Sequence, residues 1–163
     1  MALTNAQLQT LKTAIDADPA LSSQPMTSDG AFAIAAAMNL DSDPAVIVWR
    51  KAIPAMEMGK TVIYDALAAM TSANTSRVSL FMDLNRDSFD GSADLDAYFA
   101  DTFGGALNGQ GANCRAALAA MLRRTATRAE ALYATGAGTS NDPSTLVVEG
   151  EIIYQDVERA RAL

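Results

Sequence analysis

A cluster of carboxylate and amide side chains between residues 83 and 94 is the part of the sequence best suited to bind a metal ion. Asp83, Asn85 and Asp87 stand at alternate positions, and Asp94 is the twelfth residue counted from Asp83. Oxygen ligands at this spacing can wrap one calcium ion. Ser88, however, stands where such loops need glycine for a sharp turn, and Asp94 is shorter than the usual bidentate glutamate. The sequence favours a solvated acidic loop, with calcium binding as the alternative.

The other motifs that could carry chemistry are incomplete. Gly59-Lys60-Thr61 resembles the end of a phosphate-binding loop, but Pro54 stands where that loop needs a glycine. Cys114 has no histidine to activate it, because the chain contains none, so we interpret it as a small packed residue. No nucleophile can be matched with a base. We therefore expect no enzymatic activity, no cofactor and no metal ion.

Arginines cluster between residues 115 and 128, and an aromatic residue stands beside another arginine near the middle of the chain. The cluster could meet an acidic partner, but a solvated face opposite the chain's own acidic loops is favoured. Trp49 with Arg50 is either an exposed anchor at an interface or part of the core. The clustered arginines are Arg115, Arg123, Arg124 and Arg128, of which the last two share a face if the segment is helical.

Composition limits the class of protein. The chain has 163 residues, 50% hydrophobic and 19% charged, which suits one domain with a sizeable core. Alanine-rich runs such as residues 116–120 favour helix. The single cysteine excludes an internal disulfide, and a net charge of −7 without a basic stripe argues against a dedicated nucleic-acid binder. No apolar run approaches the ~20 residues that span a bilayer, and residues 1–11 lack a secretory pattern, so we expect a protein made in the cytoplasm.

Capping and periodicity predict the helices that must position these residues. Thr4 and Gln7 have capping-box spacing before an apolar periodic segment that Pro19 ends. Residues 20–27 are expected to form a loop. Further helices are predicted over residues 29–40, from Pro54 to Met70, over 75–84, from Ser92 to Phe103, over 113–124, and from a second capping box at Thr127 to Gly136. The apolar face of the helix over 29–40 is expected to contain Phe32, Ala35, Ala36 and Leu40.

Two segments contain β-branched residues. Residues 44–53 begin like a helix but contain the run Val46–Trp49, so the extended conformation is weakly favoured. Residues 145–154 alternate in hydrophobicity, which predicts one bent strand or a tight hairpin centred on Gly150. Residues 155–163 could form a final helical turn or a tail. We therefore expect a mainly α fold, a small helical bundle over residues 1–144 with a strand-like C-terminal arm and extended tail over residues 145–163.

The strand-like arm has a bearing on function. A strand exposes unpaired N–H and C=O groups, and leaving them unpaired on burial is costly. The chain offers few other strands, so the arm can pair either with Val46–Trp49 inside one subunit or with another polypeptide by strand addition. The sequence favours the second possibility.

Five segments of the chain carry a resemblance to known proteins, and the similarity covers nearly the whole chain. They are residues 3–12, 16–21, 48–50, 125–138 and 148–157. These segments resemble a small family of virion proteins from tailed bacteriophages, whose nearest functional class is the head-to-tail adaptor, also called a connector.

The resemblance implies a mainly helical structural protein that forms a ring, typically dodecameric, beneath the portal in the neck of the virion. The implied partners are copies of the same chain, the portal protein, a stopper or tail-side neck protein, and double-stranded DNA that passes through the lumen without specific binding. An acidic chain suits such a duct, because like charge disfavours sticking to phosphate. The alternatives are another neck protein, such as a stopper or tail terminator, and a small acidic calcium-binding or regulatory module.

Combining the arm with this resemblance, we expect the C-terminal residues to reach a neighbouring subunit or the portal, where the arginines could pair with acidic groups. The residues expected to contact partner chains are Leu146, Val147, Val148, Ile152, Ile153, Tyr154, Val157, Arg159, Arg161, Trp49 and Arg50.

Overall fold

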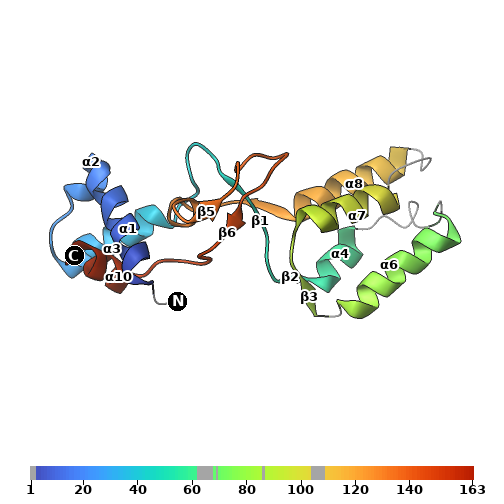
Figure 1. The fold of residues 1–163 in the computed structure, drawn as a ribbon, viewed down its shortest axis with the longest axis horizontal. Helices are drawn as coiled ribbons and strands as arrows, with labels where there is room; N and C mark the ends of the chain where they lie inside the picture. Colours follow the sequence, from blue (N-terminus) through green and yellow to red (C-terminus); the bar gives the residue numbers. More distant parts are fainter. Residues whose placement is uncertain (1–2, 62–67, 69, 86, 104–108) are drawn as a thin grey trace. The chain divides into compact units, whose positions relative to one another are not determined.

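A computed structural model of the chain describes residues 3–61, 68, 70–85, 87–103 and 109–163. The described chain is mainly α with a few short strands, as the sequence predicts (Figure 1). It folds as two compact units: unit 1 comprises Met1–Val48 and Thr125–Leu163, and unit 2 comprises Trp49–Arg124. The expected division into a helical body over residues 1–144 and an arm over residues 145–163 is therefore wrong, because the C-terminal residues fold with the N-terminal helices.

The N-terminal helices of unit 1 begin at the caps that the sequence predicts. In α1 (Asn5–Ala17) the Gln7 backbone N–H donates to the Thr4 hydroxyl at 3.3 Å, which completes the predicted capping box. Pro19 does not start a loop; it occupies the first turn of a short helix, α2 (Pro19–Ser22), capped by Asp18. The expected loop over residues 20–27 is therefore shorter, because proline fits the first turn of a new helix as well as it ends the previous one.

The third helix, α3 (Ser28–Met38), buries a different face from the one predicted. The expected face of Phe32, Ala35, Ala36 and Leu40 is wrong except at Ala35, and Phe32 is 54% exposed. Two stripes of this helix fit helical spacing, because apolar residues occupy nearly every position, so periodicity could not choose between them. The buried side is formed by Ala31, Ile34, Ala35 and Met38.

Short strands support the extended interpretation of residues 44–53. β1 (Ile47–Trp49) pairs with β4 (Arg123–Thr125), and β5 (Ala134–Thr135) pairs antiparallel with β6 (Thr145–Leu146). The predicted helix over residues 113–124 is corrected at its end, since Arg124 lies in β4 and Arg128 begins α9 (Arg128–Ala131). These two arginines consequently do not share a helix face.

Unit 2 packs its helices around an aromatic and aliphatic core. Its elements are β2 (Ile53–Pro54), α4 (Ala55–Thr61), α6 (Ser72–Leu84), β3 (Ser88–Phe89), α7 (Ala93–Phe103) and α8 (Gly109–Met121), with β2 and β3 antiparallel. The core includes Phe89, Phe99, Phe103, Cys114 and Leu118, so Cys114 is a packed residue as predicted. Predicted helix positions Val62, Ile63, Ala66 and Leu67, and the glycine-rich residues 104–108, lie outside the described residues.

The C-terminal segment ends in a helix that completes unit 1. Only Thr145–Leu146 forms a strand in the predicted 145–154 region, and residues 154–161 form α10 (Tyr154–Arg161). α10 packs against α1 and α3, and Figure 1 shows this red helix beside the blue N-terminal helices. Val157 and Ala160 are fully buried there. The prediction of a strand or hairpin over residues 145–154 is therefore wrong beyond Leu146, and of the two possibilities for residues 155–163 the structure shows the helix and not the extended tail. The alternation in the sequence arises because Val148 and Ile152 are buried in the core of unit 1 while the residues between them are exposed, and not because the segment forms a strand. The residues after it form α10, which packs against α1 and α3.

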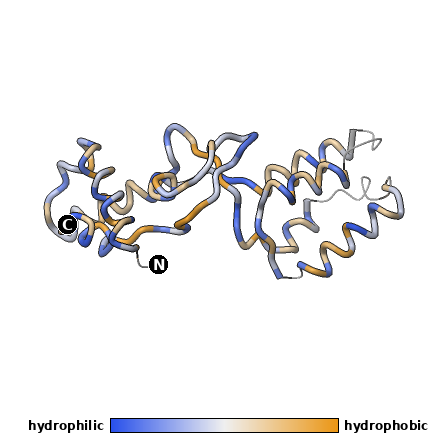
Figure 2. The backbone as a smooth tube through the Cα atoms, viewed as in Figure 1, coloured by the Kyte–Doolittle hydropathy of each residue, from blue (hydrophilic) through white to orange (hydrophobic). Residues whose placement is uncertain are grey.

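Hydropathy follows this arrangement. Figure 2 colours much of the segment between β6 and α10 orange, the colour of hydrophobic residues. Within the described part of the chain, no helix has both the length and the apolar character needed to cross a bilayer.

Adjacent isoleucines in this segment test whether it belongs to its own unit. Ile152 is 3% exposed and Ile153 is 51% exposed. We expect Ile152→Ala to lower the free energy of unfolding by about 2–5 kcal/mol, because it opens a cavity in the core. Ile153→Ala is the matched control and should change the free energy by about 0.5 kcal/mol or less. Urea unfolding followed by circular dichroism measures both, and equal effects would contradict the burial described here.

Candidate protein-binding surface

In the segment before α10, an asparagine side chain forms the backbone hydrogen bonds that a partner strand would otherwise form. The Asn39 side-chain amide donates to the Ile152 carbonyl oxygen at 2.9 Å, and the Ile152 backbone N–H donates to the Asn39 Oδ1 atom at 3.0 Å. Both polar backbone groups of a buried residue are thereby satisfied without a second strand. Asn39 is also the C-cap of α3, so the segment is fixed to the end of that helix.

A buried carboxylate binds the same segment two residues before Ile152, at Gly150. Glu130 is 2% exposed, and its Oε1 atom accepts a hydrogen bond from the Gly150 backbone N–H at 3.0 Å. Its Oε2 atom accepts from the Thr127 backbone N–H at 3.0 Å, which completes the capping box predicted for α9. Gly150 has a φ of +102°, a conformation that glycine adopts without strain. Glu130 therefore joins the start of α9 to the turn at Gly150.

An apolar groove forms where this segment meets α3. The hollow has a volume of about 390 Å³ and is almost free of polar surface. Its walls come from α3 and from the residues at the start of α10, and the Phe32 and Tyr154 rings stack there at a centroid distance of 4.1 Å. The lining residues are Phe32, Ala35, Ala36, Asn39, Ile152, Ile153, Tyr154 and Gln155. Exposed aromatic and aliphatic side chains around a groove are typical of a surface that binds another protein.

The structure divides the predicted contact residues of the C-terminal segment into two groups. Leu146, Val148, Ile152 and Val157 are buried in unit 1, so predicting them as partner contacts was wrong. Their alternation with exposed residues reflects the interior of their own unit. Val147 and Ile153 are exposed, and Tyr154 is half-buried at the groove. Phe32 and Ala36 belong to this surface as well, but the sequence placed them in the core.

The two C-terminal arginines bind their own unit. The Arg159 guanidinium donates to the Leu3 carbonyl oxygen at 3.2 Å and lies 3.4 Å from an Asp156 carboxylate oxygen. Arg161 donates to the carbonyl oxygens of Gln24 and Pro25, at 2.8 and 2.9 Å. The expectation that these arginines pair with acidic groups of a partner is corrected, because both guanidinium groups anchor α10 to the N-terminal helices.

The residues at the start of unit 2 are likewise engaged inside that unit. Arg50 forms two hydrogen bonds with the Glu57 carboxylate, at 2.6 and 3.1 Å, and this guanidinium lowers the pKa of Glu57. The Arg123 guanidinium lies over the Trp49 ring, 5.3 Å from its centroid, and pairs with Asp96. Trp49 is half-buried against the core of unit 2. The Trp49–Arg50 pair is therefore part of the packing of unit 2 and is not an exposed anchor.

Further charges of the predicted basic cluster are paired in unit 1. Arg128 donates to the Asp18 carboxylate at 2.6 Å, and this hydrogen bond lowers the pKa of Asp18. Nearby, the Tyr133 hydroxyl donates to the Gln7 carbonyl oxygen at 2.9 Å, and burial raises the pKa of Tyr133 to about 12. At Arg128 the interpretation of arginines facing the chain's own acidic groups agrees with the structure.

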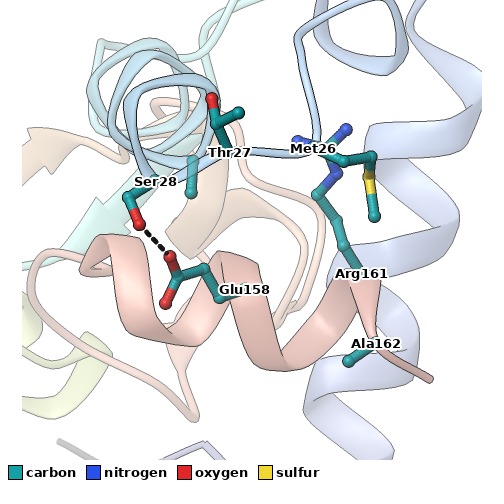
Figure 3. A pocket seen from close by; sticks show the side chains of 7 residues that line it. Met26, Thr27, Ser28, Glu158, Arg161 and Ala162 are labelled. Carbon is teal, nitrogen blue, oxygen red and sulfur yellow. Dashed lines mark hydrogen bonds between the residues drawn. The ribbon is translucent and has the colours of Figure 1, made fainter.

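A second hollow, of about 340 Å³, lies at the start of α3 (Figure 3). The Ser28 hydroxyl donates to the Glu158 carboxylate at 2.7 Å across it, and Arg161 lines it beside Met26. Each charged group in its lining already has a partner within unit 1, so this hollow is a junction between α3 and α10.

The motifs with metal-binding or phosphate-binding character do not form sites in the described part of the chain. Asp83 lies in α6 and Asp94 in α7, while the Asp90 carboxylate accepts a hydrogen bond from the Ala52 backbone N–H at 2.8 Å. Among the described residues, no three His, Cys, Asp or Glu side chains are placed to hold a metal ion. Gly59-Lys60-Thr61 ends α4 and forms no phosphate-binding loop in the residues described.

Comparison of the chain with protein-family models, curated proteins and solved structures found no match.

Substitution of Asn39 tests whether this side chain replaces a partner strand. Asn39→Ala leaves the N–H and C=O of buried Ile152 without partners, so we expect unfolding free energy to fall by about 1–3 kcal/mol. Asn39→Asp keeps the acceptor but loses the donor, so its free energy of unfolding should also fall. Asn5→Ala, at an exposed position of α1, is the control. Thermal unfolding of the three variants measures the effect, and an unchanged Asn39→Ala protein would show that another group pairs with Ile152.

Proposed function

We propose that this chain is a structural protein of a tailed-phage virion, a head-to-tail adaptor that forms a dodecameric ring between portal and tail. The observation that carries the proposal is the exposed apolar groove of unit 1, lined in part by Phe32, Ile153 and Tyr154. A surface of this kind is stabilised when another polypeptide covers it. The resemblance to phage neck proteins supplies the class of assembly.

The mainly α fold and the charge of the chain support the same role. Stoppers and tail terminators are usually richer in β-structure, whereas adaptors are mainly helical, so the observed helices favour an adaptor over its neighbours in the neck. A net charge of −7 suits a channel through which DNA slides without binding. In this proposal the chain is not an enzyme, and its contacts are heterologous contacts that close into a ring.

The proposed partners are copies of the chain, the portal protein on the head side, and a stopper or tail-side protein below. The location is the neck of the virion. The alternative of a small calcium-binding or regulatory module has weaker support, because Ser88 stands where such a loop needs glycine and no three His, Cys, Asp or Glu side chains of the described residues are placed to hold a metal ion.

Assembly with the portal tests this function. The purified chain should co-elute with the portal protein of the same phage in size-exclusion chromatography, and electron microscopy should show a ring beneath the portal. An unrelated ring-forming protein of similar size is the control for non-specific capture. Failure to bind the portal at any protein concentration would contradict the proposal. Heat released on titration with calcium would instead support the regulatory alternative.

A further inference from the structure

The net negative charge of this protein belongs to one of its two units. Unit 1 contains 11 acidic and 4 basic residues and therefore carries the whole net charge of −7. Unit 2 contains eight acidic and eight basic residues and is formally neutral. A partner of unit 1 consequently approaches a strongly acidic body, and electrostatic attraction favours a basic one.

The walls of the apolar groove come from segments that contain no lysine or arginine. None occurs between Lys12 and Arg50, which includes α3, and none occurs between Arg128 and Arg159, which includes the residues leading into α10. All lining residues of the groove are uncharged. The groove is thus an apolar surface within two wholly non-basic segments.

Exposed carboxylates flank this apolar surface. Asp29 lies one turn before Phe32 on α3, and Glu151 directly precedes Ile152. Glu158, which is exposed and also accepts a hydrogen bond from the Ser28 hydroxyl, lies one turn after Tyr154 on α10. The nearest basic residue on the same side of α10 is Arg161, whose guanidinium donates to the Gln24 and Pro25 carbonyl oxygens. The flanks of the groove therefore present negative charge.

We propose that the groove binds an amphipathic helix of another protein, one whose apolar side chains are flanked by lysine or arginine. Its apolar residues would cover Phe32, Ile153 and Tyr154, and its basic residues would face the flanking carboxylates. An apolar groove with a charged rim recognises such a helix through residues at i, i+3, i+4 and i+7. The inference rests on the proposed function only in treating the chain as a protein that binds other proteins.

A second copy of this chain is the competing occupant. Leu80 and Leu84 are exposed one turn apart on α6, in the neutral unit, and could supply an apolar face. Arg77 stands one turn before Leu80 on α6 and is paired with Asp101, and unit 2 as a whole is formally neutral, so this face fits the apolar floor of the groove better than its acidic flanks. Charge complementarity therefore favours a basic partner.

Two synthetic helical peptides test the proposal with the full chain. Both have leucine at i, i+3, i+4 and i+7; one has lysine at the remaining positions and the other has glutamate. Fluorescence anisotropy should show the lysine peptide binding at least about tenfold more tightly than the glutamate peptide at low salt, with a smaller difference at high salt. Equal binding of both peptides, or binding of neither, would overturn the inference.

Two alanines of α3 provide a matched pair of variants. Ala36 lines the groove and Ala33 is exposed outside it. Ala36→Lys and Ala33→Lys change the net charge equally. Only Ala36→Lys adds the lysine side chain at a residue that lines the groove. We expect Ala36→Lys to weaken binding of the lysine peptide by about tenfold or more, and Ala33→Lys by about threefold or less. Equal weakening would show that the peptide binds the acidic unit without using the groove.

Sedimentation velocity of the same variants examines the competing occupant. If the wild-type chain self-associates and Ala36→Lys, but not Ala33→Lys, abolishes this, a second copy occupies the groove and the inference is wrong. Portal binding is a separate readout. A chain that binds the lysine peptide but not the portal would support the groove inference and contradict the adaptor proposal. A chain that binds the portal but not the lysine peptide would support the adaptor proposal and overturn the groove inference.

Discussion

The backbone of residues 147–153 must satisfy its polar groups without a sheet, and the rest of unit 1 depends on how it does so. The Asn39 side chain pairs with both backbone groups of Ile152, and the buried Glu130 carboxylate accepts from the Gly150 N–H. Ordering these two side chains costs little conformational entropy, because each belongs to a residue that is already fixed at a helix terminus. With the segment held in this way, α10 begins at the position where it can pack against α1 and α3.

The groove is a consequence of the same constraint. Pairing of Ile152 with Asn39 turns its side chain into the core, so the next residue, Ile153, faces solvent. Tyr154 then stacks on Phe32, which lies on the side of α3 that the core does not use. An exposed apolar surface is thus built from residues whose backbone positions are fixed by hydrogen bonds deeper in the unit. Such a surface is preorganised, so the binding of a partner as proposed above would cost this chain little conformational entropy.

Local patterns in the sequence predicted the parts of the fold that local interactions determine. The capping boxes at Thr4 and Thr127 involve groups three residues apart, and both form as expected. The bond between Asn39 and Ile152 joins residues 113 positions apart, so no local pattern could indicate it. The prediction of the buried face of α3 failed for a related reason. The sequence of α3 is apolar on several sides, and only the position of α10 decides which side is covered. The candidate surface was therefore predictable at Ile153 and Tyr154 but not at Phe32 and Ala36.

Amide hydrogen exchange at Ile152 and Gly150 tests most directly whether the C-terminal segment is completed by its own unit. We expect both amides to exchange slowly in dilute protein, at rates that do not depend on protein concentration, since their acceptors are Asn39 and Glu130 of the same chain. Rapid exchange in dilute protein, with protection gained only as chains associate, would contradict the account and return the segment to a partner chain.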